Sequence, residues 1–360
     1  MKPLVLEVKG LTKHFPLGSG MFRKAVHVVQ AVSDVSFTVA AGETLAIVGE
    51  SGCGKSTTGR AIMRLIEPTA GSVKLDGEEI TELSPGRLQA TRRNMQMVFQ
   101  DPFGSLNPRM TVRETLMEPI LLHGVASGAR AKHWVDELLT TVGLAEHHAD
   151  RYPHEFSGGQ RQRICIARAL STRPRLIVCD EPVSALDVSV QAQIVNLLQD
   201  LQAQLGLAYV FISHDLSVVR HIADRVAVMY LGRIVEQAPA EQLFADPRHP
   251  YTRALISAAP RPVPGLRTAT EATEGDAPSA LHPPSGCAFH PRCPLASDIC
   301  KQTRPELQAV GEGGTLVACH HADAPAPVAL EVAPPASATL AARLSVLAAA
   351  RAAAEVPAEG

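Results

Sequence analysis

A glycine-rich turn between an apolar strand and a helix constrains the fold of this chain more than any other feature. Residues 44–48 (TLAIV) are mostly apolar, which predicts a buried strand, and residues 55–66 predict a helix that Pro68 ends. The turn between them, residues 49–56 (GESGCGKS), fits G-x-x-x-x-G-K-[ST]. Glycines at such a junction let backbone N–H groups converge at a helix N-terminus, where an anion is favoured. The segment therefore predicts a phosphate-binding loop in an α/β fold.

The residues of this loop have distinct expected roles. Lys55 would reach the β- and γ-phosphates of a nucleotide, and the Ser56 hydroxyl would ligate Mg²⁺. Cys53 occupies a variable position, and we interpret it as a filler rather than a redox switch. The bare pattern also occurs as a chance turn, but its place between strand and helix favours phosphate binding. The predicted nucleotide-binding residues are Gly49, Glu50, Ser51, Gly52, Cys53, Gly54, Lys55, Ser56 and Thr57.

A second apolar strand, residues 176–179, ends in two carboxylates. Asp180 is in the position to bind Mg²⁺, directly or through water. Glu181 would lie closer to the γ-phosphate and orient or deprotonate the attacking water. Solvated acids after a strand would explain this pair alone, but the phosphate loop about 125 residues upstream favours nucleotide hydrolysis.

The order of the remaining segments predicts a layered α/β architecture. Residues 4–48 alternate short β-like runs with turn residues, as in an antiparallel layer. Apolar strands at 175–181 and 208–215 flank an amphipathic helix at 190–205, and this alternation predicts a parallel sheet. Residues 225–238 predict a hairpin with its turn at Gly232.

Charge and hydropathy exclude several classes of protein. The chain has 34 basic and 36 acidic residues and a net charge of -2, so no overall basic field indicates nucleic-acid binding. No run of about 18 apolar residues predicts a membrane span, and the N-terminus lacks the pattern of a signal peptide. We therefore expect any association with a membrane to come through a partner.

Residues 156–163 (FSGGQRQR) narrow the class of phosphate-loop enzyme. They resemble the signature motif of ABC ATPases, with Phe156 in place of the usual leucine. SGGQ alone could be an ordinary helix cap, but it lies about 20 residues before Asp180. A helix N-terminus at this point can face a phosphate. The expected phosphate contacts are Ser157, Gly158, Gly159 and Gln160.

The resemblance to ABC ATPases covers about residues 4–260 and implies further roles. Gln100 matches the glutamine loop, which touches Mg²⁺ and the water and faces the membrane partner. Asp187 ends SALD, which matches the D-loop, and His214 matches the switch histidine that contacts the γ-phosphate. Phe15 lies where the family stacks an aromatic ring on adenine. The implied catalytic residues are Glu181, His214 and Gln100, and the implied Mg²⁺ ligands are Ser56, Gln100 and Asp180.

The resemblance also implies a fold and a mechanism. The expected fold is an ABC-type P-loop NTPase with an antiparallel β subdomain, a RecA-like parallel-sheet core and a helical signature subdomain at about residues 101–170. Each ATP would lie between the phosphate loop of one chain and the signature motif of another. A lone chain would then be a poor ATPase, because its site lacks half of its anion donors. ATP would close the dimer, and hydrolysis would reopen it.

Three segments resemble the ATPases of dipeptide and oligopeptide importers, most closely the F-type subunit. They are residues 94–112, residues 239–260 and the cysteine motif at residues 286–294. This resemblance implies a sister ATPase or a second copy, two permease subunits, a periplasmic binding protein acting indirectly, and a place on the cytoplasmic face of the inner membrane. Nickel, glutathione or an opine-like compound remain alternative cargoes. A soluble ABC protein of repair or translation is disfavoured by the single cassette and the lack of a long heptad run.

Four late cysteines form the pattern C-x5-C-x6-C-x18-C, at Cys287, Cys293, Cys300 and Cys319. Four thiolates can hold a [4Fe–4S] cluster or a tetrahedral Zn²⁺. The wide gaps favour the larger cluster, which the resemblance also implies; zinc, with help from His290 or His320, and four reduced thiols are the alternatives. We expect this segment to be an extension at residues 282–322.

Two Pro- and Ala-rich stretches flank the cysteine extension. Residues 261–281 have the composition of a linker after an ATPase domain at residues 1–260. Residues 323–360 predict a disordered tail with one amphipathic helix near 338–354.

Overall fold

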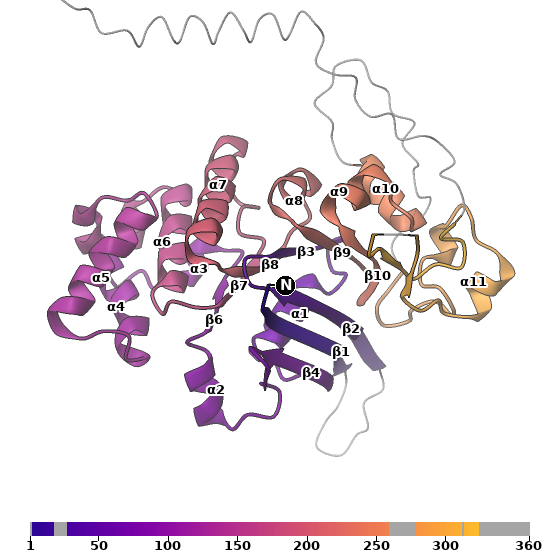
Figure 1. The fold of residues 1–360 in the computed structure, drawn as a ribbon, viewed down its shortest axis with the longest axis horizontal. Coiled ribbons are helices and arrows are strands. Elements are labelled where there is room, and N and C mark those ends of the chain that lie inside the picture. Colours follow the sequence, from indigo (N-terminus) through magenta and orange to yellow (C-terminus); the bar gives the residue numbers. More distant parts are fainter. Residues whose placement is uncertain (1, 18–26, 259–277, 312, 324–360) are drawn as a thin grey trace, which may run out of the picture. The chain divides into compact units, whose positions relative to one another are not determined.

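A computed structural model of the chain describes residues 2–17, 27–258, 278–311 and 313–323. The described residues form two β-sheets with helices around them (Figure 1). Most of the expected linker and all but the first residue of the expected tail, including the helix near 338–354, lie outside the described residues.

The larger sheet has the strand order β11-β12-β10-β9-β3-β8-β7-β6. Neighbouring strands from β9 to β6 are parallel, which confirms the parallel core, and β10 returns antiparallel to β9 through the turn at Gly232. Its strands are β3 (Thr44–Val48), β6 (Met95–Val98), β7 (Leu176–Asp180), β8 (Ala208–Ile212), β9 (Arg225–Tyr230), β10 (Arg233–Pro239), β11 (Gln308–Ala309) and β12 (Leu316–Val317).

The smaller sheet is antiparallel and comes mostly from the N-terminal part of the chain. Its strands, in spatial order, are β2 (His27–Ala40), β1 (Leu4–Leu17), β4 (Ala70–Leu75) and β5 (Glu78–Glu79). Helix α1 (Lys55–Ile62) packs against strands of both sheets. It ends four residues earlier than the sequence pattern suggested, because Arg64 adopts a left-handed conformation and its guanidinium donates to the Ile80 carbonyl.

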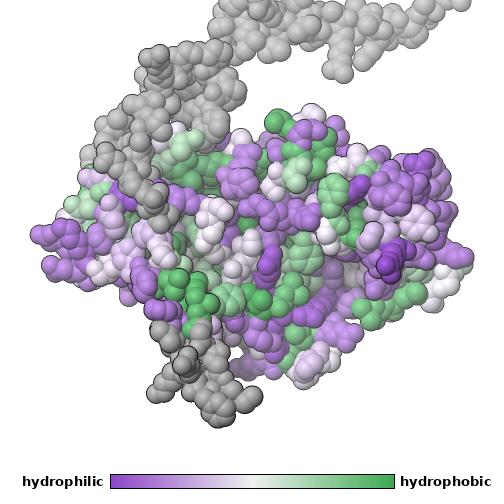
Figure 2. Space-filling model, turned by 180° about the vertical axis from the view of Figure 1, so that it is seen from behind, coloured by the Kyte–Doolittle hydropathy of each residue, from purple (hydrophilic) through white to green (hydrophobic). Residues whose placement is uncertain are grey.

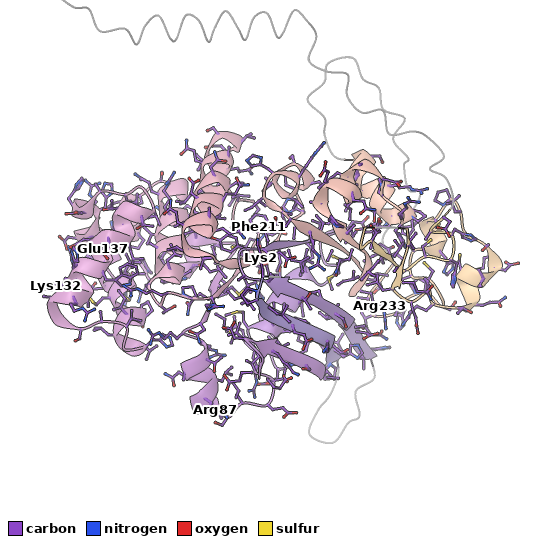
Figure 3. The ribbon with its side chains drawn as sticks, viewed as in Figure 1. Lys2, Arg87, Lys132, Glu137, Phe211 and Arg233 are labelled. Atoms are coloured by element: carbon purple, nitrogen blue, oxygen red, sulfur yellow. The ribbon has the colours of Figure 1, made fainter. Side chains whose placement is uncertain are left out.

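Most of the other helices lie beside or over the larger sheet, while α2 lies below β6 on the side of the smaller sheet (Figure 1). A helical part of the chain, α3 to α6, lies at the β6 side, and charged residues such as Lys132 and Glu137 are exposed on it (Figure 3). The helices are α2 (Pro85–Thr91), α3 (Pro102–Ser105), α4 (Val112–Leu122), α5 (Gly128–Thr141), α6 (Gly158–Leu170), α7 (Val188–Leu205), α8 (Leu216–Ile222), α9 (Ala240–Ala245), α10 (Pro250–Ala258) and α11 (Asp298–Gln302). Three short 3-10 helices are η1 (Glu146–Asp150), η2 (Pro153–Glu155) and η3 (His290–Arg292).

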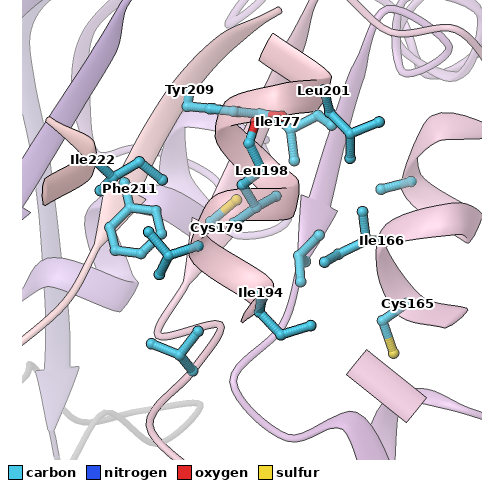
Figure 4. Packing of buried hydrophobic residues seen from close by; sticks show 14 of the residues in the cluster. Cys165, Ile166, Ile177, Cys179, Ile194, Leu198, Leu201, Tyr209, Phe211 and Ile222 are labelled. Atoms are coloured by element: carbon cyan, nitrogen blue, oxygen red, sulfur yellow. Dashed lines mark hydrogen bonds between the residues drawn. The ribbon is translucent and has the colours of Figure 1, made fainter. Parts of the chain in front are cut away.

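The central strands are buried on both faces, and their side chains alternate between two apolar cores. On β8, Tyr209 and Phe211 point toward α7 and α8, whereas Val210 points to the side of α1 and the smaller sheet. Figure 4 shows the first of these cores, with Leu198 and Leu201 of α7 packed over β7 and β8. Strands covered on both faces need near-continuous apolar runs, which is why β3, β7 and β8 were recognisable in the sequence.

The cysteine extension continues the larger sheet rather than forming a separate body. Strand β12 pairs with β10 through Glu236↔Val317 and Gln237↔Leu316, and Ala318 N–H donates to the Val235 carbonyl at 2.8 Å. Phe289 of the extension is 1% exposed and joins the apolar core. Within the described ranges, no helix has the length and apolar character needed to cross a bilayer.

Candidate functional site

The loop after β3 can adopt its conformation only with glycine at two points. Gly49 has φ 152°, and a Cβ there would lie 2.2 Å from the Met229 carbonyl oxygen. Gly54 has φ 107°, and a Cβ there would lie 2.1 Å from the Ala31 carbonyl oxygen. Both distances are far below van der Waals contact. The motif glycines therefore let the loop pass close to β9 and β2 on its way into α1.

Lys55 begins α1 and lies buried beneath the loop. Its Nζ donates hydrogen bonds to the Gly49 carbonyl at 2.8 Å and to the Glu50 carbonyl at 2.9 Å. The lysine charge is therefore fixed at the inner side of the turn, where it can meet a phosphate. Burial raises the pKa of the nearby Cys53 thiol, in agreement with a packing role for that side chain.

Ser56 and Asp180 meet across the interior between α1 and the end of β7. The Ser56 hydroxyl donates to Asp180 Oδ1 at 2.6 Å. Asp180 Oδ2 is buried with no hydrogen-bond partner in the described part of the chain, and Arg60 Nη2 lies 3.8 Å away. Burial raises the pKa of Asp180, while the hydrogen bond from Ser56 and the charge of Arg60 oppose that rise. A hydroxyl oxygen and a carboxylate oxygen side by side are ligands of the type that Mg²⁺ prefers.

The three expected catalytic side chains come together although they lie far apart in the sequence. Gln100 Nε2 donates to Glu181 Oε2 at 2.8 Å. His214 Nδ1 lies 3.2 Å from Glu181 Oε1. Glu181 itself has φ 47°, a left-handed conformation that is unusual outside glycine, so the chain reverses sharply at the end of β7. The carboxylate is thereby oriented by an amide on one side and an imidazole on the other.

A pocket of about 500 Å³ joins the loop to these side chains. Lys55, Ser56, Gln100, Glu181 and His214 all line it. Other lining residues include Ser51, Gly52, Cys53, Gly54 and Thr57 from the loop and Val29, Gln30 and Ala31 from β2. The structure thus gathers the phosphate loop, the acidic strand end and both polar partners of Glu181 around one space.

Phe15 does not line that pocket in the described structure. It pairs across the sheet with Val29, which does line it, and its ring lies 4.9 Å from Lys13 Nζ. Phe15, Leu17 and Val28 of these strands are exposed apolar residues, and Figure 2 shows hydrophobic surface on the face opposite to that of Figure 1. The stacking of Phe15 on adenine stays a prediction.

The signature residues lie at the start of α6 and not at the pocket. Ser157 accepts a hydrogen bond from Gln160 N–H at 3.4 Å, and Gln160 Oε1 accepts from Ser157 N–H at 3.1 Å, which closes a capping box. Gly159 packs so tightly against α7 that a Cβ would lie 2.4 Å from Val190 Cγ1. Asp187 caps α7, and the hydrogen bond from Val190 N–H lowers the pKa of its carboxyl.

Two side chains that bind Glu50 of the loop were not foreseen from the sequence. The Tyr251 hydroxyl, from α10, accepts a hydrogen bond from Glu50 N–H at 2.8 Å. The Arg292 guanidinium, from the cysteine extension, contacts both carboxylate oxygens of Glu50. Both lie in segments that resemble importer ATPases, residues 239–260 and 286–294, but no pattern there indicates contact with the loop, because both reach it only through the tertiary fold.

The four late cysteines are free thiols in the structure. The backbone N–H of Cys287 donates to the Cys300 carbonyl at 2.8 Å, and burial raises the pKa of Cys293 to about 11, with smaller upward effects from the other three thiols. The described residues nevertheless contain no group of three or more histidine, cysteine or acidic side chains arranged to hold a metal ion. The sulfurs as placed therefore do not fit a cluster or a zinc site, and the expected metal is not supported.

Comparison with known proteins agrees with the geometry. Residues 32–184 match the ABC transporter family, and residues 235–300 match the oligopeptide/dipeptide transporter C-terminal region. The chain is 56% identical to a probable peptide ABC transporter ATP-binding protein of Sinorhizobium fredii, over 95% of this chain and 96% of that one. It is 52% identical to the oligopeptide transport ATP-binding protein AppF of Bacillus subtilis, over 88% and 97%.

Solved structures give the same fold. The dimeric ATP-binding cassette MJ0796 bound to ADP and Pi aligns with a TM-score of 0.58 and 31% identity, over 65% of this chain and 98% of that one. The cassette cbiO1 of Clostridium perfringens aligns with the same TM-score and 26% identity, over 68% and 92%. The chain therefore belongs to the family of ABC transporter ATP-binding subunits, in the branch that carries the oligopeptide/dipeptide transporter C-terminal region.

Proposed function

We propose that this chain hydrolyses ATP to energise the import of dipeptides or oligopeptides. The observation that carries the catalytic part is the contact of Gln100 and His214 with Glu181 in the pocket that also contains Lys55 and Ser56. The cargo part rests on likeness to peptide transport ATP-binding proteins over nearly their whole length, including the C-terminal region.

In the proposed reaction the phosphates of ATP lie in the loop at residues 49–56. Lys55 neutralises charge on the β- and γ-phosphates. The Glu181 carboxylate accepts a proton from a water molecule while the water oxygen bonds to the γ-phosphorus. The bond between the γ-phosphorus and the bridging β,γ-oxygen breaks, which gives ADP and phosphate. Gln100 and His214 orient Glu181 for this step. Ser56 and Asp180 would hold Mg²⁺, which neutralises phosphate charge when bound.

A second ATPase subunit would complete the site. The signature residues of one chain lie away from its own pocket, and the structural relative MJ0796 is described as a dimer with ADP and Pi. We propose that Ser157 and the α6 N-terminus of a partner supply N–H donors to the γ-phosphate. The partner would be a sister ATPase or a second copy of this chain.

A cleft beside Gln100 is suited to a permease subunit at the cytoplasmic face of the inner membrane. The cleft measures about 660 Å³ and lies between α1, β6 and the helical part of the chain. Gln100 lines both this cleft and the nucleotide pocket, so a partner in the cleft can sense nucleotide state. Apolar side chains on the nearby segments are exposed, namely Leu65, Phe103, Leu121 and Leu122. Two such permeases and a periplasmic binding protein would complete the importer.

A [4Fe–4S] cluster in the extension is a separate part of the proposal. The spacing of the four cysteines supports it, but the sulfurs would have to move together to form the site, because the described residues contain no group arranged to hold a metal ion. An anaerobically prepared sample should be brown, absorb near 400 nm and contain iron, and a Cys293→Ser variant should lose all three properties. A colourless wild-type sample without iron would contradict the cluster.

The function is tested by two experiments. The full chain with its membrane partners should hydrolyse ATP and lose that activity on Glu181→Gln. A deletion strain should lose growth on dipeptides and recover it with the wild-type chain but not with the variant. Wild-type growth of the deletion strain on dipeptides, with a defect on nickel, glutathione or an opine-like compound, would reassign the cargo while leaving the ATPase intact.

A further inference from the structure

Arg292 lies in the cysteine extension and contacts Glu50 of the phosphate loop. Its Nη1 lies 3.1 Å from Glu50 Oε2, and its Nη2 lies 3.0 Å from Glu50 Oε1. This is the two-pronged geometry in which a guanidinium binds a carboxylate best. Glu50 follows Gly49 in the loop, so the ion pair joins two segments that are 242 residues apart.

The extension presents Arg292 from a rigid base. Phe289, three residues earlier, is 1% exposed and packs edge-on against Tyr230, with ring centres 5.4 Å apart, and at the same distance from Tyr251. Gly286 has φ 63°, and a Cβ there would lie 2.3 Å from the Cys300 carbonyl oxygen, so the turn that leads into this segment is tightly packed. The guanidinium is therefore fixed by the fold of the extension.

Glu50 is held by contacts on two sides, and it also contacts Lys55. The Tyr251 hydroxyl accepts a hydrogen bond from its backbone N–H, while Arg292 binds its carboxylate. The Glu50 carbonyl in turn accepts a hydrogen bond from Lys55 Nζ at 2.9 Å. A shift of Glu50 would therefore move both the backbone of the loop and the cation that meets the phosphates.

The ion pair is partly desolvated, so its electrostatic interaction is stronger than that of a surface pair. The Arg292 side chain is 10% exposed and that of Glu50 is 33% exposed. The hydrogen bonds to Glu50 raise the pKa of Arg292 despite its burial, so the guanidinium stays charged. Without it, the partly buried Glu50 carboxylate would be left unpaired, which destabilises the position that Glu50 has in the loop.

We propose that Arg292 is a positioning residue for nucleotide binding, and that through its pair with Glu50 the cysteine extension sets the affinity of the phosphate loop for ATP. The inference rests on the assignment of residues 49–56 as the phosphate loop. It gives the extension a role in the ATPase cycle that does not require the extension to bind a metal.

The test is the dissociation constant of Mg·ATP for the full chain, measured by titration calorimetry. Arg292→Met should weaken binding about tenfold, within the usual range of coupling between sites. Arg292→Lys, which keeps the charge but loses the two-pronged contact with the carboxylate, should weaken ATP binding about threefold. Lys301→Met is the matched control, because it removes an exposed ion pair with Asp298 in the same extension, and it should leave affinity unchanged.

A double-mutant cycle separates positioning from a general structural role. In a Glu50→Gln background, Arg292→Met should change affinity by no more than about twofold, since the pair is already broken. In steady state, assayed with the membrane and ATPase partners present, Arg292→Met should raise KM for ATP about tenfold and leave kcat within about twofold. An equal loss in both backgrounds, or wild-type affinity in a folded Arg292→Met chain, would overturn the proposal. If Arg292→Met does not fold, wild-type affinity of Arg292→Lys overturns it instead.

Lys55→Ala distinguishes failure of this inference from failure of the proposed function. If Lys55→Ala loses ATP binding while Arg292→Met binds normally, the loop assignment holds and only the coupling is wrong. If Lys55→Ala binds ATP as tightly as the wild type, the loop is not the nucleotide site and both proposals fail.

Discussion

Replacing Gly54 by alanine should destabilise the chain far more than the same change at Gly52, two residues earlier. Both glycines have positive φ, 107° and 78°, where an alanine costs about 1–2 kcal/mol. The Cβ at position 52 would meet nothing within 4 Å, so that cost stands alone. At position 54 the Cβ would lie 2.1 Å from the backbone oxygen of Ala31, which cannot rotate away.

The backbone of β2 or the loop must therefore shift in Gly54→Ala, and such overpacking adds about 1–3 kcal/mol. We expect a loss of about 1–2 kcal/mol for Gly52→Ala and about 2–5 kcal/mol for Gly54→Ala. A difference of about 2 kcal/mol corresponds to about 3 °C in Tm for a chain of this length. Gly52→Ala is the matched control, since it lies in the same loop and has the same chemistry.

The measurement is thermal unfolding followed by far-UV circular dichroism without nucleotide, so that any change in ATP affinity does not enter. Equal Tm values for the two variants would refute the argument that close backbone approach, and not φ alone, requires glycine at position 54. A Gly52→Ala chain less stable than Gly54→Ala would refute it more strongly.

Two further predictions concern the site, and a third concerns His249, which is 1% exposed and directly precedes α10. Glu181→Gln should lower kcat by about 10²–10⁴-fold and retain ATP binding, whereas Glu137→Gln on the exposed face of α5 should leave kcat unchanged; wild-type turnover in Glu181→Gln would rule out the proposed base. Lys55→Ala should weaken ATP binding about a hundredfold by loss of charge-assisted hydrogen bonds, measured by calorimetry. Burial lowers the pKa of His249 to about 3, so the unfolded chain binds the extra proton and stability falls as pH drops below 6.5, by up to about 1.4 kcal/mol per pH unit. Denaturant unfolding of His249→Gln should show a shallower fall, and an equal slope would contradict this reasoning.

The parts of the fold that the sequence predicted are those with strong local patterns. The expected boundary of the strand at 44–48 is the observed one, because five consecutive buried residues between turn signals leave little freedom. Helix α7 carries its own N-cap, Asp187, and its own C-cap, Gly206 at φ 66°. The capping box of Ser157 and Gln160 likewise marks the start of α6 in the sequence itself.

The parts that the sequence did not predict depend on contacts between distant segments. Strand β12 has only two residues, and no hydrophobic repeat in the sequence predicts its pairing with β10. Arg64 ends α1 early because its side chain reaches the Ile80 carbonyl, a tertiary contact that outweighs helix propensity. The ion pair of Arg292 with Glu50 is also a tertiary contact, and no sequence pattern around either residue predicts it.

The position of the signature motif adds a constraint on the chemistry of the whole site. One chain gathers Lys55, Gln100 and Glu181 around the pocket, while Ser157 lies at the N-terminus of α6, outside the residues that line it. Tight packing of α6 on α7 leaves little freedom to bring that N-terminus round to its own pocket. Donors aimed at developing charge on the γ-phosphate provide much of the catalysis in phosphoryl transfer. We therefore expect a chain to bind ATP with its own loop and to need a second subunit for efficient hydrolysis.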